Sequence, residues 1–151
     1  LRPWSPSLPV TTELLLIFAA RFAHLQQTIC PALARGEIVL CDRFVDSSYV
    51  YQGVLGGAPT GLIDELVRQL PAPTPRLSLI FDLPPSESLA RQQARGQGNR
   101  FDSADLARLE AIRQAFLERL AAQPSSHRRI DALATPDVVQ AQILEALLPC
   151  L

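Results

Sequence analysis

Asp42 and Arg43 form an ionic pair at a position that favours chemistry. They directly follow Glu37–Cys41, a short apolar run with β-branched residues that predicts a buried strand. In open parallel sheets, ligands bind beyond the carboxyl ends of the strands. A carboxylate and a guanidinium at such an end are therefore placed for a magnesium ion and a phosphate. The alternative is a structural ion pair without a ligand.

Polar side chains continue on the helical turn that we expect after this pair. They could present hydroxyls and an amide to one ligand, and they are Ser47, Ser48, Tyr51 and Gln52. Each residue alone is a weak indication, but their order and spacing after Arg43 place them on one short segment.

Arg21 lies inside the apolar stripe of a predicted helix, one turn from Ile17 and Leu25. A charge on a buried face is costly unless it is paired. Two interpretations follow from this position. Arg21 forms an internal salt bridge, for example with Asp42, or its guanidinium points into a ligand pocket beside Phe18.

Taken together, these residues resemble the bacterial thymidylate kinase family in residue type, order and spacing. The resemblance covers about residue 11 to the end, and its most specific element is the cluster from Asp42-Arg43-Phe44 to Tyr51-Gln52-Gly53. The other matching segments are Phe18-Ala19-Ala20-Arg21, 31–36, 81–84, 95–101 and 130–132.

The resemblance implies transfer of the γ-phosphoryl group of ATP to dTMP, giving dTDP, with Mg²⁺ as the metal. At the base, Phe18 or Ile17 would stack on thymine, Arg21 would hydrogen-bond a thymine carbonyl, and Ser48 would lie near the base edge. At the sugar, Tyr51 would contact the deoxyribose, and Gln52 belongs to the same acceptor site.

The resemblance also assigns residues to the phosphates. Arg43 would hold the acceptor phosphate, and Asp42 would help to organise the magnesium–phosphate cluster without binding the metal directly. Arg95 and Arg100 would neutralise the transferring phosphoryl group from a lid, and Arg91 and Arg95 would face ATP. An ordinary solvated basic surface is the alternative for these arginines.

The sequence departs from the family pattern at several points. All 14 basic residues are arginine, so the chain has no GxxxxGK[ST] phosphate-binding loop, which needs a lysine. The chain also starts at Leu1 and contains no methionine. We therefore expect an N-terminally truncated chain that is inactive as a kinase by itself. The segment 53–59 and Asn99, where an aspartate is usual, also differ from the family.

Two other classes of function stay open. The chain could be a non-catalytic relative that binds a nucleotide or a partner. It could also be a deoxynucleoside kinase. Arg43 makes this alternative less favoured, because a guanidinium suits a substrate that already carries a phosphate. A preference for dTMP over dUMP is not determined by these residues.

Strands alternating with helices predict an α/β fold with a parallel sheet flanked by helices, and the resemblance implies that this sheet is of the P-loop kinase type. The sheet would be incomplete, because the strand, P-loop and helix of the family would precede residue 1. We expect a flexible start over 1–10 and one domain over 11–151. The expected strands are 37–41, 77–83 and 129–131, and the expected helices are 12–28, 47–52, 62–70, 86–95, 102–122 and one from 136, with a short turn at 31–35 that Gly36 stops. The hydroxyl of Thr11 or Thr12 would cap the first helix.

Composition limits the partners. The net charge of −1 indicates no nucleic-acid ligand, and no apolar run is long enough to span a membrane. We therefore expect a cytoplasmic protein, and the resemblance implies dTMP as its acceptor substrate. The apolar first helix would also allow a homodimer, which members of the family commonly form through their long helices.

Overall fold

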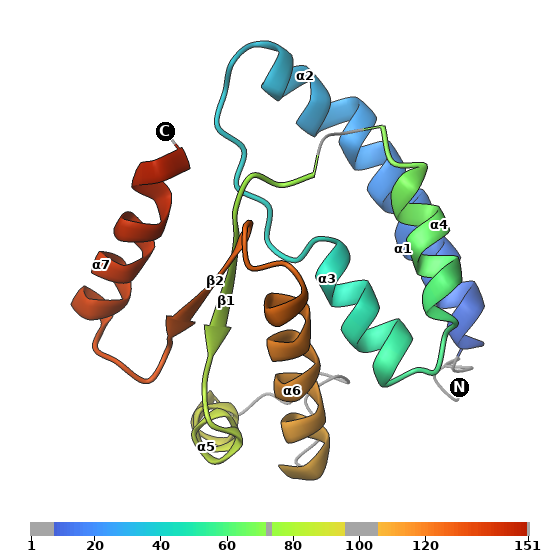
Figure 1. Ribbon diagram of the computed structural model, residues 1–151. Helices are drawn as coiled ribbons and strands as arrows, with labels where there is room; N and C mark the ends of the chain where they lie inside the picture. Colours follow the sequence, from blue (N-terminus) through green and yellow to red (C-terminus); the bar gives the residue numbers. More distant parts are fainter. Residues whose placement is uncertain (1–7, 72–73, 96–105, 151) are drawn as a thin grey trace. The chain divides into compact units, whose positions relative to one another are not determined.

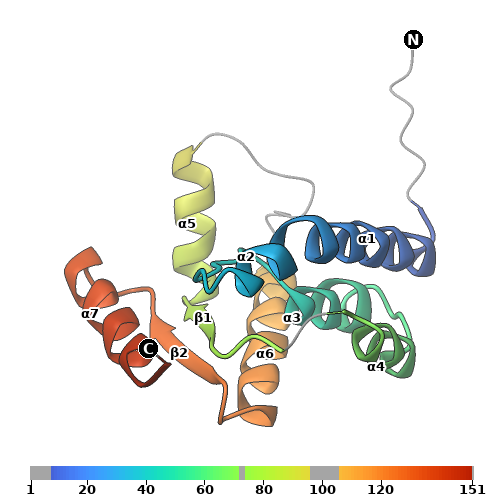
Figure 2. The ribbon, with the colours of Figure 1, turned by 90° about the horizontal axis from the view of Figure 1, so that it is seen from above.

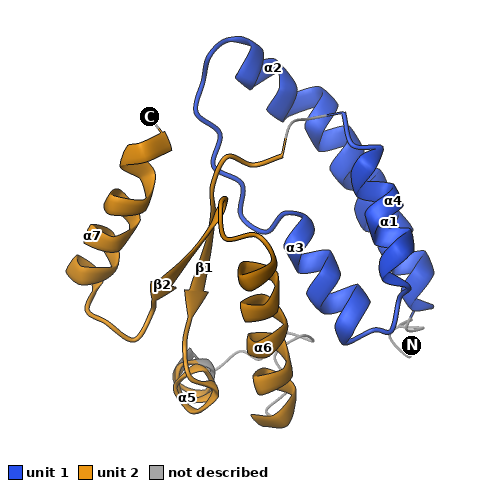
Figure 3. Cartoon of the chain, viewed as in Figure 1, with its two compact units in different colours: residues 1–73 blue, residues 74–151 orange. Residues whose placement is uncertain are grey.

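The computed structural model describes residues 8–71, 74–95 and 106–150, apart from the side chains of Gln92 and Arg95. The chain divides into two compact units, Leu1–Pro73 (unit 1) and Thr74–Leu151 (unit 2), which Figure 3 shows in two colours. In the part of the chain that is described, no helix has both the length and the apolar character needed to cross a membrane.

Unit 1 begins with a long helical rod. Helix α1 (Val10–His24) continues through the π-helical turn η1 (Leu25–Ile29) into α2 (Cys30–Ala34), as Figure 1 shows. The predicted hydroxyl cap by Thr11 or Thr12 is wrong, because the N-cap is Pro9, whose carbonyl accepts the amide of Glu13 at 3.0 Å. The predicted stop at Gly36 is confirmed, since its φ of +77° suits glycine.

Two further helical segments complete unit 1. Helix α3 (Val45–Ser48) runs directly into the π-helical turn η2 (Tyr49–Val54), and α4 (Thr60–Arg68) follows. The predicted helices over 47–52 and 62–70 are confirmed, each with an earlier start. Helices α1 and α4 lie side by side because their apolar faces share one core, formed by Leu14, Phe18, Ala58 and Ile63.

The predicted strand at 37–41 is wrong. The structure has no strand there, and Ile38 and Leu40 are 75% and 87% exposed. A strand exists only through hydrogen bonds to a neighbouring strand, and among the described residues this segment has no such neighbour. The apolar pattern alone could not reveal that pairing was lacking.

Unit 2 contains the sheet. Strands β1 (Ser78–Asp82) and β2 (His127–Asp131) pair in parallel, with Ser78 opposite His127 and Asp82 opposite Asp131. Both strands lie within or around the predicted ranges. The described part of the sheet therefore has two strands instead of the three that the sequence predicts.

Helices surround this sheet. Helix α6 (Leu106–Ala122) packs on both strands, and α7 (Pro136–Leu147) packs on β2 from the other side, as Figures 1 and 2 show. Helix α5 (Pro85–Arg95) packs on α6, and the 3₁₀ turn η3 (Leu148–Cys150) follows α7. The fold is a mostly helical α/β arrangement with a small parallel sheet.

Candidate functional site

The guanidinium of Arg21 lies in a half-buried site between α1 and the start of α3. Its Nη2 donates to the carbonyl oxygen of Phe44 and to Oγ of Ser48, both at 3.2 Å. Its Cζ lies 4.6 Å from the ring centroid of Phe18 and 5.4 Å from that of Phe44. Both distances are within the range of a cation–π contact.

The alternative of a salt bridge between Arg21 and Asp42 is wrong. No carboxylate of the described residues lies within ion-pair distance of Arg21, whose acceptors are a carbonyl and a hydroxyl instead. Its Nη1 is buried and has no hydrogen-bond partner. Burial lowers the pKa of the Arg21 guanidinium, which a smaller interaction with Cys41 opposes.

The structure also brings Arg43 and Tyr51 together. The guanidinium of Arg43 lies 5.2 Å from the ring centroid of Tyr51, and Arg43 is exposed. Its φ is +59°, the left-handed region that a residue with a Cβ rarely adopts. Backbone strain of this kind is concentrated at functional sites. The predicted phosphate-binding arginine therefore occupies the strained turn that begins α3.

The other residues predicted to contact the base and the sugar are buried to different extents. Ser48 and Phe18 are each 1% exposed, whereas Ile17 is half-buried. Gln52 is 4% exposed, and its Nε2 donates to the Glu13 carboxylate of α1 at 3.0 Å. Stacking by Phe18 or Ile17 and substrate contact by Gln52 stay predictions.

Asp42 is the predicted carboxylate for the magnesium cluster, and it is exposed. Among the described residues, no group of three or more His, Cys, Asp or Glu side chains could hold a metal. Mg²⁺ is commonly bound through one or two carboxylates together with substrate phosphates and water. An exposed carboxylate beside Arg43 fits the expected role next to such a site, without a direct bond to the metal.

Unit 2 carries the arginines predicted for ATP. Nη2 of Arg91 donates to the Ala132 carbonyl, in the loop after β2, at 3.1 Å. Arg95 is the last residue of α5, and its side chain lies outside the described part, as do Arg100 and Asn99 entirely. Their predicted roles therefore stay predictions.

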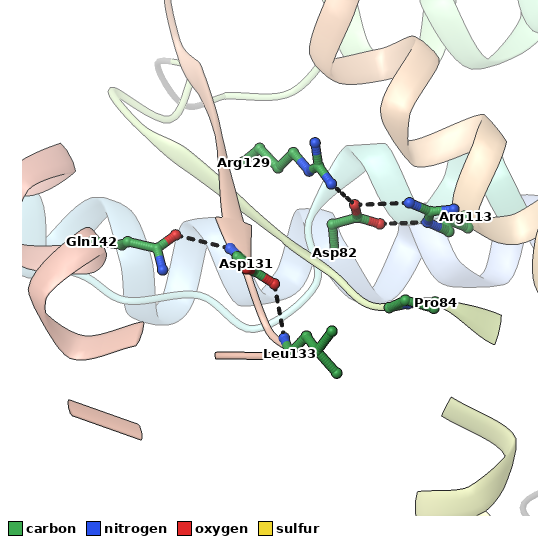
Figure 4. A pocket seen from close by; sticks show the side chains of 7 residues that line it. All are labelled: Asp82, Pro84, Arg113, Arg129, Asp131, Leu133 and Gln142. Atoms are coloured by element: carbon green, nitrogen blue, oxygen red, sulfur yellow. Dashed lines mark hydrogen bonds and ion pairs between the residues drawn. The ribbon is translucent and has the colours of Figure 1, made fainter. Parts of the chain in front are cut away.

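A pocket of about 400 Å³ lies beside that loop, at the carboxyl ends of β1 and β2. Figure 4 shows Asp82 at its wall, with Arg113 and Arg129 directed at the carboxylate. Arg113 donates to both carboxylate oxygens, at 2.6 and 3.1 Å, and Arg129 approaches to 2.5 Å. The hydrogen bonds from Arg113 hold the pKa of Asp82 below its ordinary value, although burial acts in the opposite direction.

Sequence reasoning missed Phe44 and the Asp82 cluster. Phe44 belongs to the recognised Asp-Arg-Phe segment, but its spacing does not show that it faces Arg21. Asp82 lies next to the end of a predicted strand, which is a signal that could have been used. Its partners Arg113 and Arg129 come from distant parts of the sequence, and only the fold brings them together.

Comparisons with known proteins point to one family. The Thymidylate kinase family model matches residues 6–143. The chain is 49% identical to a thymidylate kinase of Ectopseudomonas mendocina, over 100% of this chain and 72% of the relative. It is 46% identical to one from Pseudomonas putida (strain GB-1), over 99% of this chain and 71% of the relative.

A solved structure agrees as well. The crystal structure of thymidylate kinase from Ehrlichia chaffeensis matches with a TM-score of 0.72 and 25% identity. The match covers 95% of this chain and 67% of that one, so the fold is partial relative to the longer homologue. Thymidylate kinases are transferases of dTTP synthesis, and the expected parallel-sheet kinase fold is thereby confirmed. By sequence and by fold, this chain belongs to the thymidylate kinase family.

Proposed function

We propose that this chain provides the acceptor-nucleotide side of an enzyme that transfers a phosphoryl group from ATP to dTMP, giving dTDP. The observation that carries the proposal is the pair of arginines around the start of α3. Arg21 is half-buried with an unpartnered nitrogen, and Arg43 is exposed beside Tyr51. A nucleoside monophosphate has the two matching groups, a base with carbonyl oxygens and an anionic phosphate.

The proposed roles combine this arrangement with the family pattern. Arg21 donates to a thymine carbonyl, with Ser48 beside it and Ile17 or Phe18 against the base. Arg43 binds the acceptor phosphate, and Tyr51 lies against the deoxyribose. Gln52 lies on the same segment, and its hydrogen bond to Glu13 ties that segment to α1.

The donor side concerns ATP and Mg²⁺. Asp42 helps to hold the magnesium–phosphate cluster, and the metal, when bound, neutralises phosphate charge. By the family pattern, Arg95 and Arg100 neutralise the transferring phosphoryl group, and Arg91 and Arg95 bind ATP. The 151 residues include no lysine for a phosphate-binding loop, so they do not fit the β- and γ-phosphates of ATP. We therefore expect no dTDP formation by these 151 residues alone.

Calorimetric titration of the 151-residue chain with dTMP and with thymidine tests this proposal. We expect dTMP to bind at least about tenfold more tightly, because only dTMP offers Arg43 a phosphate. Arg43→Gln should remove most of that preference. Arg68→Gln is the matched control, since Arg68 is an exposed arginine of unit 1 paired only with Glu65 in the described contacts.

Each other result has a distinct meaning. Equal binding of thymidine and dTMP would contradict a phosphate acceptor and favour a deoxynucleoside kinase. Binding of neither would favour a partner-binding relative. ATP-dependent formation of dTDP by the purified chain would overturn the expectation of inactivity.

A further inference from the structure

The first turn of α3 holds the Arg21 guanidinium from two directions. The carbonyl of Phe44 and the hydroxyl of Ser48 both accept from Nη2, so the two protons of that nitrogen are engaged. The rings of Phe44 and Phe18 lie near the guanidinium carbon. Rotation of the guanidinium would break both hydrogen bonds and would also lose the contacts with the two rings.

This arrangement leaves Nη1 as a buried donor nitrogen without an acceptor. Buried N–H groups are almost always hydrogen-bonded in proteins, because the unpaired state carries the full desolvation cost. A guanidinium has donors only and cannot accept a hydrogen bond. The site therefore lacks one oxygen acceptor next to Nη1. The position of Nη1 is set by the hydrogen bonds of Nη2 to Phe44 and Ser48.

The acceptors themselves are held firmly. Phe44 precedes the first residue of α3, and its carbonyl also accepts the amide of Ser47 at 3.3 Å. Ser48 is 1% exposed within the same short helix. Both acceptors thus belong to one turn, and that turn follows directly on Arg43.

We infer that Phe44 and Ser48 are positioning residues that aim Nη1 of Arg21 at a carbonyl oxygen of the ligand base. The inference rests on the proposed function for the identity of that ligand, a pyrimidine nucleotide. A base with an amino group in place of that carbonyl, as in dCMP, would bring its own N–H donor against the N–H donor of Nη1. The held guanidinium therefore favours dTMP over dCMP through geometry that Arg21 alone does not provide.

Two substitutions test this inference. Phe44→Leu keeps an apolar side chain and the backbone carbonyl but removes the aromatic face, and Ser48→Ala removes one acceptor. We expect each to weaken dTMP binding about tenfold, with little change for dCMP, so that the preference for dTMP falls. Phe44→Tyr keeps the ring and should recover most of the preference.

Tyr49→Phe is the matched control for these variants. Tyr49 lies on the adjoining turn, and its hydroxyl donates to Asp64, which is not one of the acceptors of Arg21. A merely structural role of Phe44 and Ser48 would weaken both nucleotides equally and leave their ratio unchanged. An unchanged ratio in both variants would overturn the inference.

A second measurement needs no ligand. Nitrogen-15 NMR of the arginine side chains reports rotation of the Arg21 guanidinium, with Arg21→Lys to assign the signal. We expect restrained rotation in the parent chain and faster exchange in both variants: at least about tenfold faster in S48A, which loses one hydrogen bond, and a smaller increase in F44L, which loses only the aromatic contact. If the parent chain binds no dTMP, the proposed function fails, and this readout decides the positioning roles alone. Equal rotation in all variants would refute them.

Discussion

The buried carboxylate of Asp82 gives the sharpest prediction about stability. It is 5% exposed and joins three elements of unit 2, because Arg113 comes from α6 and Arg129 from β2. Asp82→Asn keeps the size of the side chain and one oxygen acceptor. It removes the negative charge on which both ion pairs depend.

The magnitude follows from the geometry. Removing one partner of a fully buried ion pair costs about 3–5 kcal/mol, and a hydrogen bond to a charged group is worth about 1.5–3 kcal/mol. Water can reach the arginine side chains, which are 29% and 58% exposed, so the remaining charges are partly solvated. We therefore expect Asp82→Asn to lower the free energy of unfolding by about 2 kcal/mol at pH 7.

The effect should depend on pH in a defined direction. Arg113 lowers the pKa of Asp82 in the folded state, relative to about 3.9 in the unfolded chain. The stabilisation is thus fully present above about pH 5 and is lost as the pH falls through the folded-state pKa. The difference between the parent chain and D82N should shrink over that acidic range.

Urea unfolding followed by circular dichroism at pH 7, 5, 4 and 3 measures this difference. Hydrogen exchange of the β1 and β2 amides then reports on unit 2 itself. Glu145→Gln is the control, since Glu145 is an exposed carboxylate of α7. A D82N chain as stable as the parent at pH 7, or a difference that persists undiminished at pH 3, would refute the reasoning.

Two backbone predictions concern unit 1 and can be checked by thermal or urea unfolding. A Cβ at Gly56 would lie 2.5 Å from Val10 Cγ2, so Gly56→Ala should destabilise by about 1–3 kcal/mol. Gly61→Ala, which meets nothing within 4 Å on helix α4, should stabilise by about 0.5–1 kcal/mol. Equal effects of the two glycine substitutions on stability would contradict this account. Arg43→Gly should be about 1 kcal/mol more stable than Arg43→Ala, because both lose the Tyr51 contact but only glycine relieves the positive φ. Equal stabilities would show that the turn is unstrained.

Local signals in the sequence were sufficient for much of the fold. Apolar periodicity identified the helices, because a helix satisfies its backbone hydrogen bonds within its own segment. Gly36 and Pro136 indicated a helix end and a helix start for the same local reason. The cluster from Asp42 to Gly53 was enough to indicate the family that the comparisons then showed.

The remaining features depend on residues distant in the sequence. A strand forms only by hydrogen bonding to a neighbouring strand. The apolar run at 37–41 has no such neighbour among the described residues, so its prediction as a strand was wrong. The acceptors of Arg21 lie 23 and 27 residues away, and those of Arg113 lie 31 residues away. Sequence determined which charged groups were present and that Arg21 needed a partner. Only the tertiary structure decided which partner each received, because burial and distance set the energy of a charge and neither is a local property.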